Sequence, residues 1–207
     1  MSELGVYLGG EGANELGSYS GHPSYYDEAR PGVIAALLRR VRPSGWRIVG
    51  ATKWSTIRKL QAHGPSPNEV RNVRALILDA KEANADVLAF TRDSDGDPQR
   101  ARELELAVSE HDAAGARPDL IGGVAIPVLE AWLLALDGEL GTEQLSKGGA
   151  QARFEQKHAF AKVTEKVVAY VESTDLNDIP SDAVRLSIWL ARARAVLPGD
   201  VPGPRTE

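Results

Sequence analysis

The stretch VLAFTRDSDGD, residues 87–97, decides how the rest of the sequence is interpreted. Its first part, Val87–Thr91, is an apolar run with the length of a buried β-strand. Asp93, Asp95 and Asp97 follow at alternate positions, and their like charges repel one another at short distance. The stretch therefore predicts a buried strand whose end carries either a solvated turn or a site where a cation joins the carboxylates.

Strands and helices alternate along the first two thirds of the chain. Three further β-like runs accompany the strand at Val87–Thr91: Leu4–Leu8, Trp46–Gly50 and Ile121–Ile126. Between these runs, apolar residues recur at the helical period over residues 32–42, 69–84 and 98–114. This alternation predicts an α/β fold with a four-stranded parallel sheet flanked by helices. Such sheets bind ligands at the carboxyl ends of their strands.

The last third of the chain is predicted to be helical. Pro127 suits the first position of a helix that runs to about Leu136, and residues 138–151 are interpreted as a loop with a short turn. Helical periodicity returns at about residues 158–172 and 181–196. We therefore expect an α/β domain, a helical extension packed on it and a flexible tail, over residues 1–137, 138–197 and 198–207.

The composition is that of a globular protein and excludes several kinds of chemistry. The 207 residues are 43% hydrophobic and 26% charged, both ordinary values. Cysteine is absent, which excludes disulfides, zinc thiolate sites and cysteine nucleophiles and favours a reducing compartment. The sequence has no apolar run long enough to span a membrane and no secretory signal, so we expect a cytoplasmic protein without a membrane partner.

Charge is unevenly distributed, although the net charge is only −5. Between Arg30 and Arg74 the sequence has ten Lys or Arg and one acid, Glu69, so this segment carries +9. The other residues include 14 basic and 28 acidic side chains. The basic segment indicates either a face that binds a polyanion or solvated helix surfaces that pair with the acidic remainder.

A tryptophan lies among cations in the long segment of residues 51–68. An aromatic ring beside several positive charges suits the stacking of single-stranded nucleic acid. The same spacing also suits a short helix in which Trp54, Ile57 and Leu60 pack inward. The candidate nucleic-acid-binding residues are Lys53, Trp54, Arg58, Lys59 and, beside the aspartates, Arg92.

The first strand leads into a glycine-rich loop, residues 9–27, that fails two phosphate-binding motifs. Ser18 stands where a Walker loop needs its lysine, and Glu15 stands where a dinucleotide fingerprint needs its third glycine. The loop does provide a carboxylate, Glu11, directly after the strand. This acid is the feature of the loop that bears on the aspartates.

Parallel strands deliver their carboxyl ends to one edge of a sheet, so Glu11 is expected to lie near Asp93 and Asp95. Glu130, in the first turn of the helix after the fourth strand, reaches the same edge. A cluster of carboxylates without histidine or cysteine selects Mg²⁺ or Mn²⁺. These ions polarise phosphoryl oxygens and activate water. The sequence therefore predicts a divalent-metal site at this edge.

Each of these acids also has a structural interpretation. Asp97 precedes a proline and suits a helix N-cap, beside its place among the candidate metal ligands. Asp93 and Asp95 also suit a turn, and Glu15 and Glu130 also suit the first turns of helices. The histidines are scattered along the chain and are interpreted as structural or solvent-facing: His22, His63, His111 and His158.

Three stretches together resemble the Toprim domain of topoisomerases, primases and OLD-type nucleases, and more closely a group of small stand-alone bacterial Toprim-like proteins. They are EGANE (Glu11–Glu15), RDSDGD (Arg92–Asp97) and AIPVLEAWLLAL (Ala125–Leu136), within roughly residues 4–137. The resemblance implies that Glu11 is a general acid/base or metal-organising glutamate. It further implies that Asp93 and Asp95 bind a divalent ion and that Glu130 is an added acid near it.

The resemblance has one departure. In that family a helix closely follows the first glutamate, whereas Gly17, Gly21 and Pro23 predict no helix here and leave the role of Glu15 open. A loop that carries tyrosines intervenes instead, and it is interpreted as a lid or a partner-binding element: Tyr19, Tyr25 and Tyr26.

The leading functional hypothesis is a Mg²⁺- or Mn²⁺-dependent nuclease that cleaves phosphodiester bonds in DNA or RNA. Its expected catalytic residues are Glu11, Asp93, Asp95 and Glu130, and the candidate metal ligands add Asp97. The resemblance also implies an ATPase partner protein and a role in bacterial defence against phage. Two alternatives stay open: a non-catalytic Toprim-like assembly subunit, and a nucleotide-sugar glycosyltransferase that uses its Asp-x-Asp.

Overall fold

Four parallel strands form the centre of the molecule, as the sequence pattern predicts. They are β1 (Leu4–Gly10), β2 (Trp46–Lys53), β3 (Val87–Asp93) and β4 (Asp119–Ala125), arranged in the order β2-β1-β3-β4. The computed structural model describes residues 3–18, 30–57 and 67–197. The expected Tyr19–Tyr26 loop and the tail at 198–207 lie outside these ranges.

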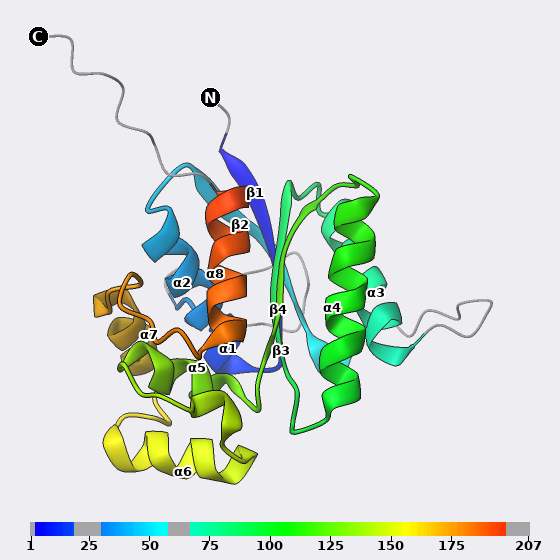
Figure 1. Ribbon diagram of the computed structural model, residues 1–207. Coiled ribbons are helices and arrows are strands. Elements are labelled where there is room, and N and C mark those ends of the chain that lie inside the picture. Colours follow the sequence, from blue (N-terminus) through cyan, green and yellow to red (C-terminus); the bar gives the residue numbers. More distant parts are fainter. Residues whose placement is uncertain (1–2, 19–29, 58–66, 198–207) are drawn as a thin grey trace, which may run out of the picture.

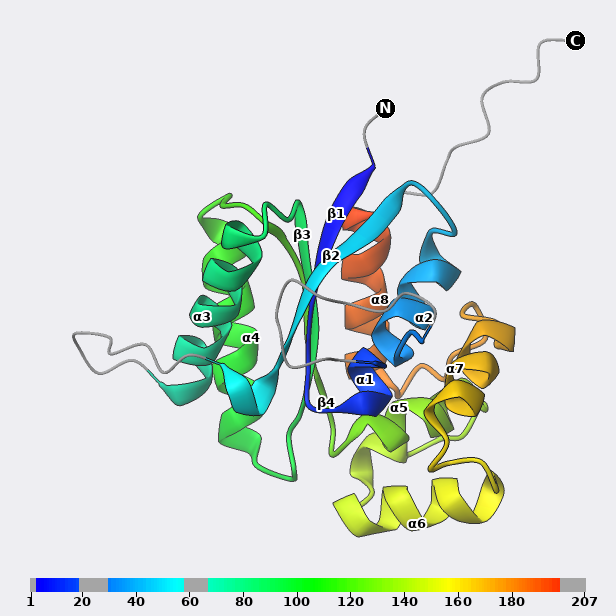
Figure 2. The ribbon, with the colours of Figure 1, turned by 180° about the vertical axis from the view of Figure 1, so that it is seen from behind.

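Helices cover both faces of the sheet and make a three-layer α/β/α arrangement (Figures 1 and 2). On one face lie α3 (Asn68–Glu82) and α4 (Pro98–Ala113), and on the other lie α2 (Val33–Val41) and α8 (Val184–Val196). The two central strands, β1 and β3, are largely apolar on both sides because both faces of the sheet are buried. Successive residues of a strand consequently enter different hydrophobic clusters, as Val6 and Tyr7 do.

The segment after residue 137 shares the core of the sheet domain rather than forming a core of its own. It contains η2 (Thr142–Gln144), α6 (Lys147–Lys157), α7 (Thr164–Ser173) and α8, and it follows α5 (Leu129–Leu136). Trp189 of α8 is fully buried, packs against Trp132 of α5 and donates a hydrogen bond from its Nε1 to the Phe90 carbonyl at 3.0 Å. The extension is therefore joined to the sheet by continuous apolar packing.

Three local predictions were wrong. Residues 138–151 were expected to be a loop, but α6 begins at Lys147 after Ser146, whose hydroxyl caps the helix by accepting from the Gly149 amide. The next helix, α7, begins at Thr164 instead of residue 158. No helix was expected after Glu11, but a single turn, α1 (Ala13–Leu16), follows it closely.

Within the ranges that the structure describes, no helix is both long enough and apolar enough to cross a membrane.

Three helices, α1, α5 and α6, gather at the carboxyl edge of the sheet, the lower end in Figures 1 and 2. This is the edge at which parallel sheets bind their ligands.

Candidate functional site

Four carboxylates line one open pocket of about 390 Å³ at the carboxyl edge of the sheet. Glu11 and Glu15 come from the end of β1 and from α1, Asp93 from the last position of β3, and Glu130 from the first turn of α5. Lys147 of α6 completes the charged lining. The structure thus brings together three of the four expected catalytic acids and adds Glu15, whose role the sequence left open.

The tight turn after β1 brings Glu15 to this pocket. Gly10 has no side chain, so α1 folds back directly against the strand; a Cβ there would lie only 2.7 Å from the Glu15 Cβ. The Gly12 amide then donates to Glu15 Oε2 at 2.9 Å and closes the turn. Glu15 is only 7% exposed, and burial, together with the charges of Glu11 and Glu130, raises the pKa of its carboxyl.

Glu11 is held by two donors from β3. Its Oε1 accepts from the Arg92 Nη1 at 2.5 Å and from the Asp93 amide at 3.1 Å. Arg92 itself lies over the Trp54 ring, 5.3 Å from its centroid, and also pairs with Glu69. The Arg92 side chain is only 16% exposed, so it anchors Glu11 from inside the protein and does not present its charge to a nucleic acid as predicted.

Asp93 is the most strongly perturbed acid of the pocket. Its Oδ1 accepts from the Leu129 amide at the start of α5, at 2.9 Å. Burial, followed by the charges of Glu11, Glu15 and Glu130, raises the pKa of Asp93 to about 8. Burial and the neighbouring acids together therefore keep a proton on Asp93 at neutral pH in the absence of a cation.

The donor set suits a hard divalent cation. All four acids offer carboxylate oxygens, and no hydrogen bond from the described residues ends on Glu11 Oε2 or Asp93 Oδ2. Burial also raises the pKa of Glu130, so its ionised form gains from a positive partner. Among the residues with described positions, no three acidic or imidazole side chains are already closed around an ion-sized centre. The carboxylates are gathered in one pocket, and hydrogen bonds orient Glu11, Glu15 and Asp93 within it.

Asp95 does not line this pocket, although it is only two positions from Asp93. The strand ends at Asp93, and Asp95 adopts a left-handed backbone conformation with φ of 53° in the turn that follows. Its carboxylate accepts from Arg100 Nη1 at 2.6 Å and from Lys147 Nζ at 2.7 Å. Burial alone would raise the pKa of Asp95, but the hydrogen bonds from Lys147 and Arg100 outweigh it and leave this pKa below its usual value.

Two other predicted site residues, Asp97 and Trp54, stabilise the fold. Asp97 is the N-cap of α4 and accepts from the Gln99 amide at 2.8 Å, which confirms its interpretation as a cap. Trp54 is only 6% exposed, so its ring is not available to stack on a base. It lies in the short helix η1 (Trp54–Thr56), packed against Phe90, and Ile57 is buried as well. The inward-packing interpretation is therefore confirmed for Trp54 and Ile57, while Leu60 lies outside the described residues.

The structure describes only one of the remaining candidates for nucleic-acid binding. Lys53 ends β2 and is partly buried, while Arg58 and Lys59 lie outside the described residues. Two histidines have structural partners, as predicted: His111 bonds the Pro118 carbonyl and His158 bonds Asp137. The other two, His22 and His63, are not covered.

Lys147 is the site residue that sequence reasoning missed. Its segment contains two glycines and was interpreted as a loop, so no helix was expected to carry a cation to this edge. The available signal was Ser146, which is a favourable N-cap residue directly before it. Asn14 was missed as well; its Oδ1 accepts from the Thr164 hydroxyl at 2.9 Å and ties α1 to α7 beside the pocket.

Comparison with protein-family models, with curated proteins and with solved structures gives no match for this chain.

Proposed function

We propose that this chain is a Mg²⁺- or Mn²⁺-dependent phosphodiesterase of the Toprim-like kind that cleaves nucleic acid. The observation that carries the proposal is the crowding of Glu11, Glu15, Asp93 and Glu130 around one open pocket. Burial, together with the charges of the neighbouring acids, raises the pKa of Asp93 to about 8, so ionising Asp93 costs free energy that a divalent cation between the carboxylates offsets. Sites that perturb their acids in this way are candidates for catalysis.

Each residue of the pocket has a distinct role in this proposal. A bound Mg²⁺ or Mn²⁺ supplies polarisation of the phosphoryl oxygens and activation of water. Glu11 and Asp93 contribute the carboxylate oxygens that are free of hydrogen bonds. Lys147 places a positive charge at the rim, where it stabilises negative charge that develops on a phosphoryl group. Glu15, with its raised pKa, is suited to hold a proton at the pocket wall.

The basic segment gives less support to nucleic-acid binding than its charge indicates. Arg39 pairs with Glu172 and Arg74 pairs with Glu110, as solvated helix faces do. Among the described residues, Lys53 remains a candidate for contact with nucleic acid. Nucleic acid as substrate therefore rests on the Toprim resemblance and on the phosphoryl chemistry of the pocket. The resemblance also leads us to propose an ATPase partner and a role in phage defence, which co-purification with a candidate ATPase would test.

A non-catalytic assembly subunit is the second candidate, and one observation favours it. Glu11 is already neutralised by Arg92, and Asp95 by Arg100 and Lys147, so ion pairs within the chain hold this edge together without a metal. Titration calorimetry with Mg²⁺ and Mn²⁺ separates the two candidates, since an assembly subunit need not bind either ion. Asp93 and Asp95 do not line the same pocket, which weakens the Asp-x-Asp pair of a glycosyltransferase. The same placement leaves Asp95 out of the metal ligands that the Toprim resemblance implies, so the proposed nuclease relies on Glu11, Asp93 and Glu130.

The decisive experiment is a cleavage assay with single- and double-stranded DNA and with RNA, in Mg²⁺, Mn²⁺ or EDTA. The variants are Asp93→Asn and Glu11→Gln, which keep the shape of the side chain and remove its charge. The matched control is Asp119→Asn, an acid at the amino end of β4 that pairs with Arg117. We expect metal-dependent cleavage that both site variants abolish and the control retains. Equal cleavage by Asp93→Asn and the unmodified chain would overturn the proposal.

A further inference from the structure

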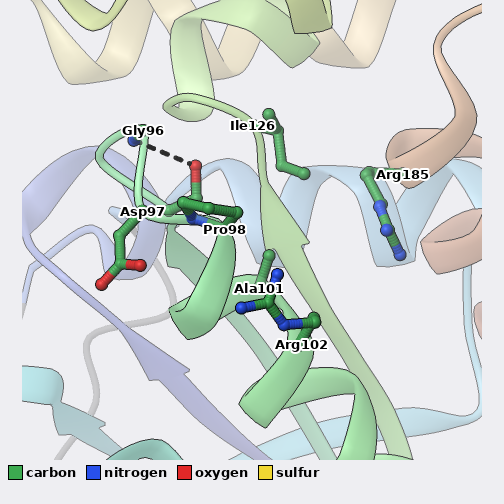
Figure 3. A pocket seen from close by; sticks show the side chains of 8 residues that line it. Gly96, Asp97, Pro98, Ala101, Arg102, Ile126 and Arg185 are labelled. Carbon is green, nitrogen blue, oxygen red and sulfur yellow. Dashed lines mark hydrogen bonds between the residues drawn. The ribbon is translucent and has the colours of Figure 1, made fainter.

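A second pocket lies on the other side of the loop that joins β3 to α4. Its volume is about 330 Å³, within the range of small-molecule sites. Figure 3 shows its lining: Arg102 from α4 and Arg185 from α8 flank a patch formed by Pro98, Ala101 and Ile126. Its chemistry is opposite to that of the carboxylate pocket, because its charged side chains are mainly cations.

Arg102 has an uncommitted positive charge. Within the ranges that the structure describes, its guanidinium makes no hydrogen bond and no ion pair, and the residue is exposed to solvent. It projects from the first turns of α4 toward the pocket in Figure 3. A guanidinium in this position is free to bind an anion with its planar set of donors.

Among the described residues, the Arg185 guanidinium makes one long ion pair. Its Nη1 lies 3.5 Å from Glu105 Oε1, whereas Arg192 holds the other oxygen of Glu105 at 2.9 Å. One carboxylate therefore serves two arginines. A second acid, Glu143, also lies beside Arg185 and accepts from its backbone amide at 2.6 Å, so Arg102 supplies the unpaired positive charge of this pocket. The acid of the lining, Asp97, is occupied by the backbone amides of α4, and its carboxylate points away from Arg185 in Figure 3.

We propose that this pocket binds the phosphate group of a nucleotide, held by Arg102 and Arg185, with the base or sugar against Pro98, Ala101 and Ile126. Each guanidinium offers a planar set of donors that suits a phosphate, and the apolar residues of the same lining suit the flat face of a heterocycle. Inorganic anions would gain nothing from these apolar residues. The apolar residues therefore favour a phosphate ester over free phosphate.

The pocket is separate from the proposed catalytic centre. Asp93 lines the carboxylate pocket, while Ser94, Gly96 and Asp97 of the same loop line this one. The loop is rigidly held, since the Ser94 amide donates to the Ala125 carbonyl and the Asp95 amide to the Pro127 carbonyl. A nucleotide here needs no metal, so its binding is measurable without cleavage and independently of whether the chain is a nuclease.

The test is titration calorimetry in EDTA at low salt, with adenosine monophosphate, inorganic phosphate and oligonucleotides with or without a 5′-phosphate as probes. The variants are Arg102→Gln and Arg185→Gln. Arg117→Gln is the matched control, because this exposed arginine lies in the connection before β4 and pairs with Asp119. We expect each site variant to weaken binding about tenfold or more and the control to leave it unchanged. Arg102→Lys, which keeps the charge, is expected to lose less than Arg102→Gln.

The probes also distinguish the source of the phosphate. Tight binding of adenosine monophosphate assigns the pocket to a free nucleotide, and binding only of the 5′-phosphorylated oligonucleotide assigns it to the end of a strand. In either case added salt should weaken binding, since charge attraction carries much of it. The proposal is overturned if none of the nucleotide probes binds, or if binding is the same in Arg102→Gln and Arg185→Gln as in the control.

Discussion

Glu11 and Asp93, which are 82 positions apart in the chain, are joined by a hydrogen bond from the Asp93 amide to Glu11 Oε1 at 3.1 Å. The bond exists because β1 and β3 are parallel neighbours in the sheet, with Gly9 opposite Phe90. Both acids therefore leave their strands at the same edge, and the side chain of one is oriented by the backbone of the other. This contact holds the two carboxyl groups close together, and the first two predictions depend on it.

Asp93→Asn should stabilise the metal-free protein at alkaline pH. The Asp93 carboxyl keeps its proton up to about pH 8 when folded, whereas its reference pKa is 3.8. The folded state thus binds more protons between these values, so this group makes folding less favourable as pH rises through the window. In EDTA at pH 8, urea unfolding should give Asp93→Asn a free energy of unfolding about 2 kcal/mol higher than that of the unmodified chain. The difference should vanish near pH 4; a gain that is the same at both pH values would contradict the assignment.

In the presence of Mg²⁺ the unmodified chain should be more stable than Asp93→Asn, the reverse of the order in EDTA. A cation that binds the folded pocket stabilises it by mass action, and it requires ionised Asp93. Adding Mg²⁺ or Mn²⁺ at pH 8 should raise the melting temperature of the unmodified chain and leave that of Asp93→Asn unchanged. The Asp119→Asn control should respond as the unmodified chain does. Equal shifts in all three proteins would indicate ion binding elsewhere.

Lys147→Met should lower the rate of cleavage far more than it lowers stability. Removal of one preorganised charge at a phosphoryl site typically costs about 10²-fold or more in kcat. Its ion pair with Asp95 is solvent-accessible, with the lysine side chain 51% exposed, so its loss should change unfolding by less than about 1 kcal/mol. The control is Lys157→Met on the same helix, since Lys157 pairs with Asp137 and Glu139. Comparable kcat values for the two variants would contradict the role of Lys147.

Asp97→Ala should destabilise the protein by about 1 kcal/mol, because it removes the side chain that accepts from the amides of Gln99 and Arg100. Asp97→Asn keeps a capping oxygen and should recover most of this loss. Chemical denaturation of both variants makes the comparison. If Asp97 were a metal ligand as well, Asp97→Asn would weaken Mg²⁺ binding while it preserved stability.

Gly10→Ala should cost about 1–3 kcal/mol, because a Cβ at this position meets the Glu15 Cβ at 2.7 Å and Leu16 at 3.0 Å. The strain would push α1 away from β1 and should weaken metal binding as well. Gly148→Ala is the control: Gly148 is helical, nothing lies within 4 Å of the added methyl group, and alanine favours the helix. Thermal unfolding of the two variants should therefore change in opposite directions.

Local patterns were sufficient to predict the sheet and the helix cap. The apolar run before Asp93 and the three similar runs identify the strands because a strand buried on both faces must be apolar throughout. Asp97 before Pro98 identifies a helix start because its side chain bonds amides only two and three residues away. The α6 helix escaped prediction because Gly148 and Gly149 are poor helix formers, and its formation depends on packing of Ala150 and Phe154.

The arrangement of the acids could be predicted only in part. The order of the elements and the shared direction of the strands were enough to predict that Glu11, Asp93 and Glu130 lie at one edge. The reason is that the carboxyl ends of parallel strands lie at the same edge of a sheet. Whether Asp95 joins them was decided by the fold, which ends β3 at Asp93 and turns Asp95 toward Arg100 and Lys147. Alternation along a sequence predicts which side chains share a face only while the chain remains a strand, and the end of a strand is set by long-range contacts.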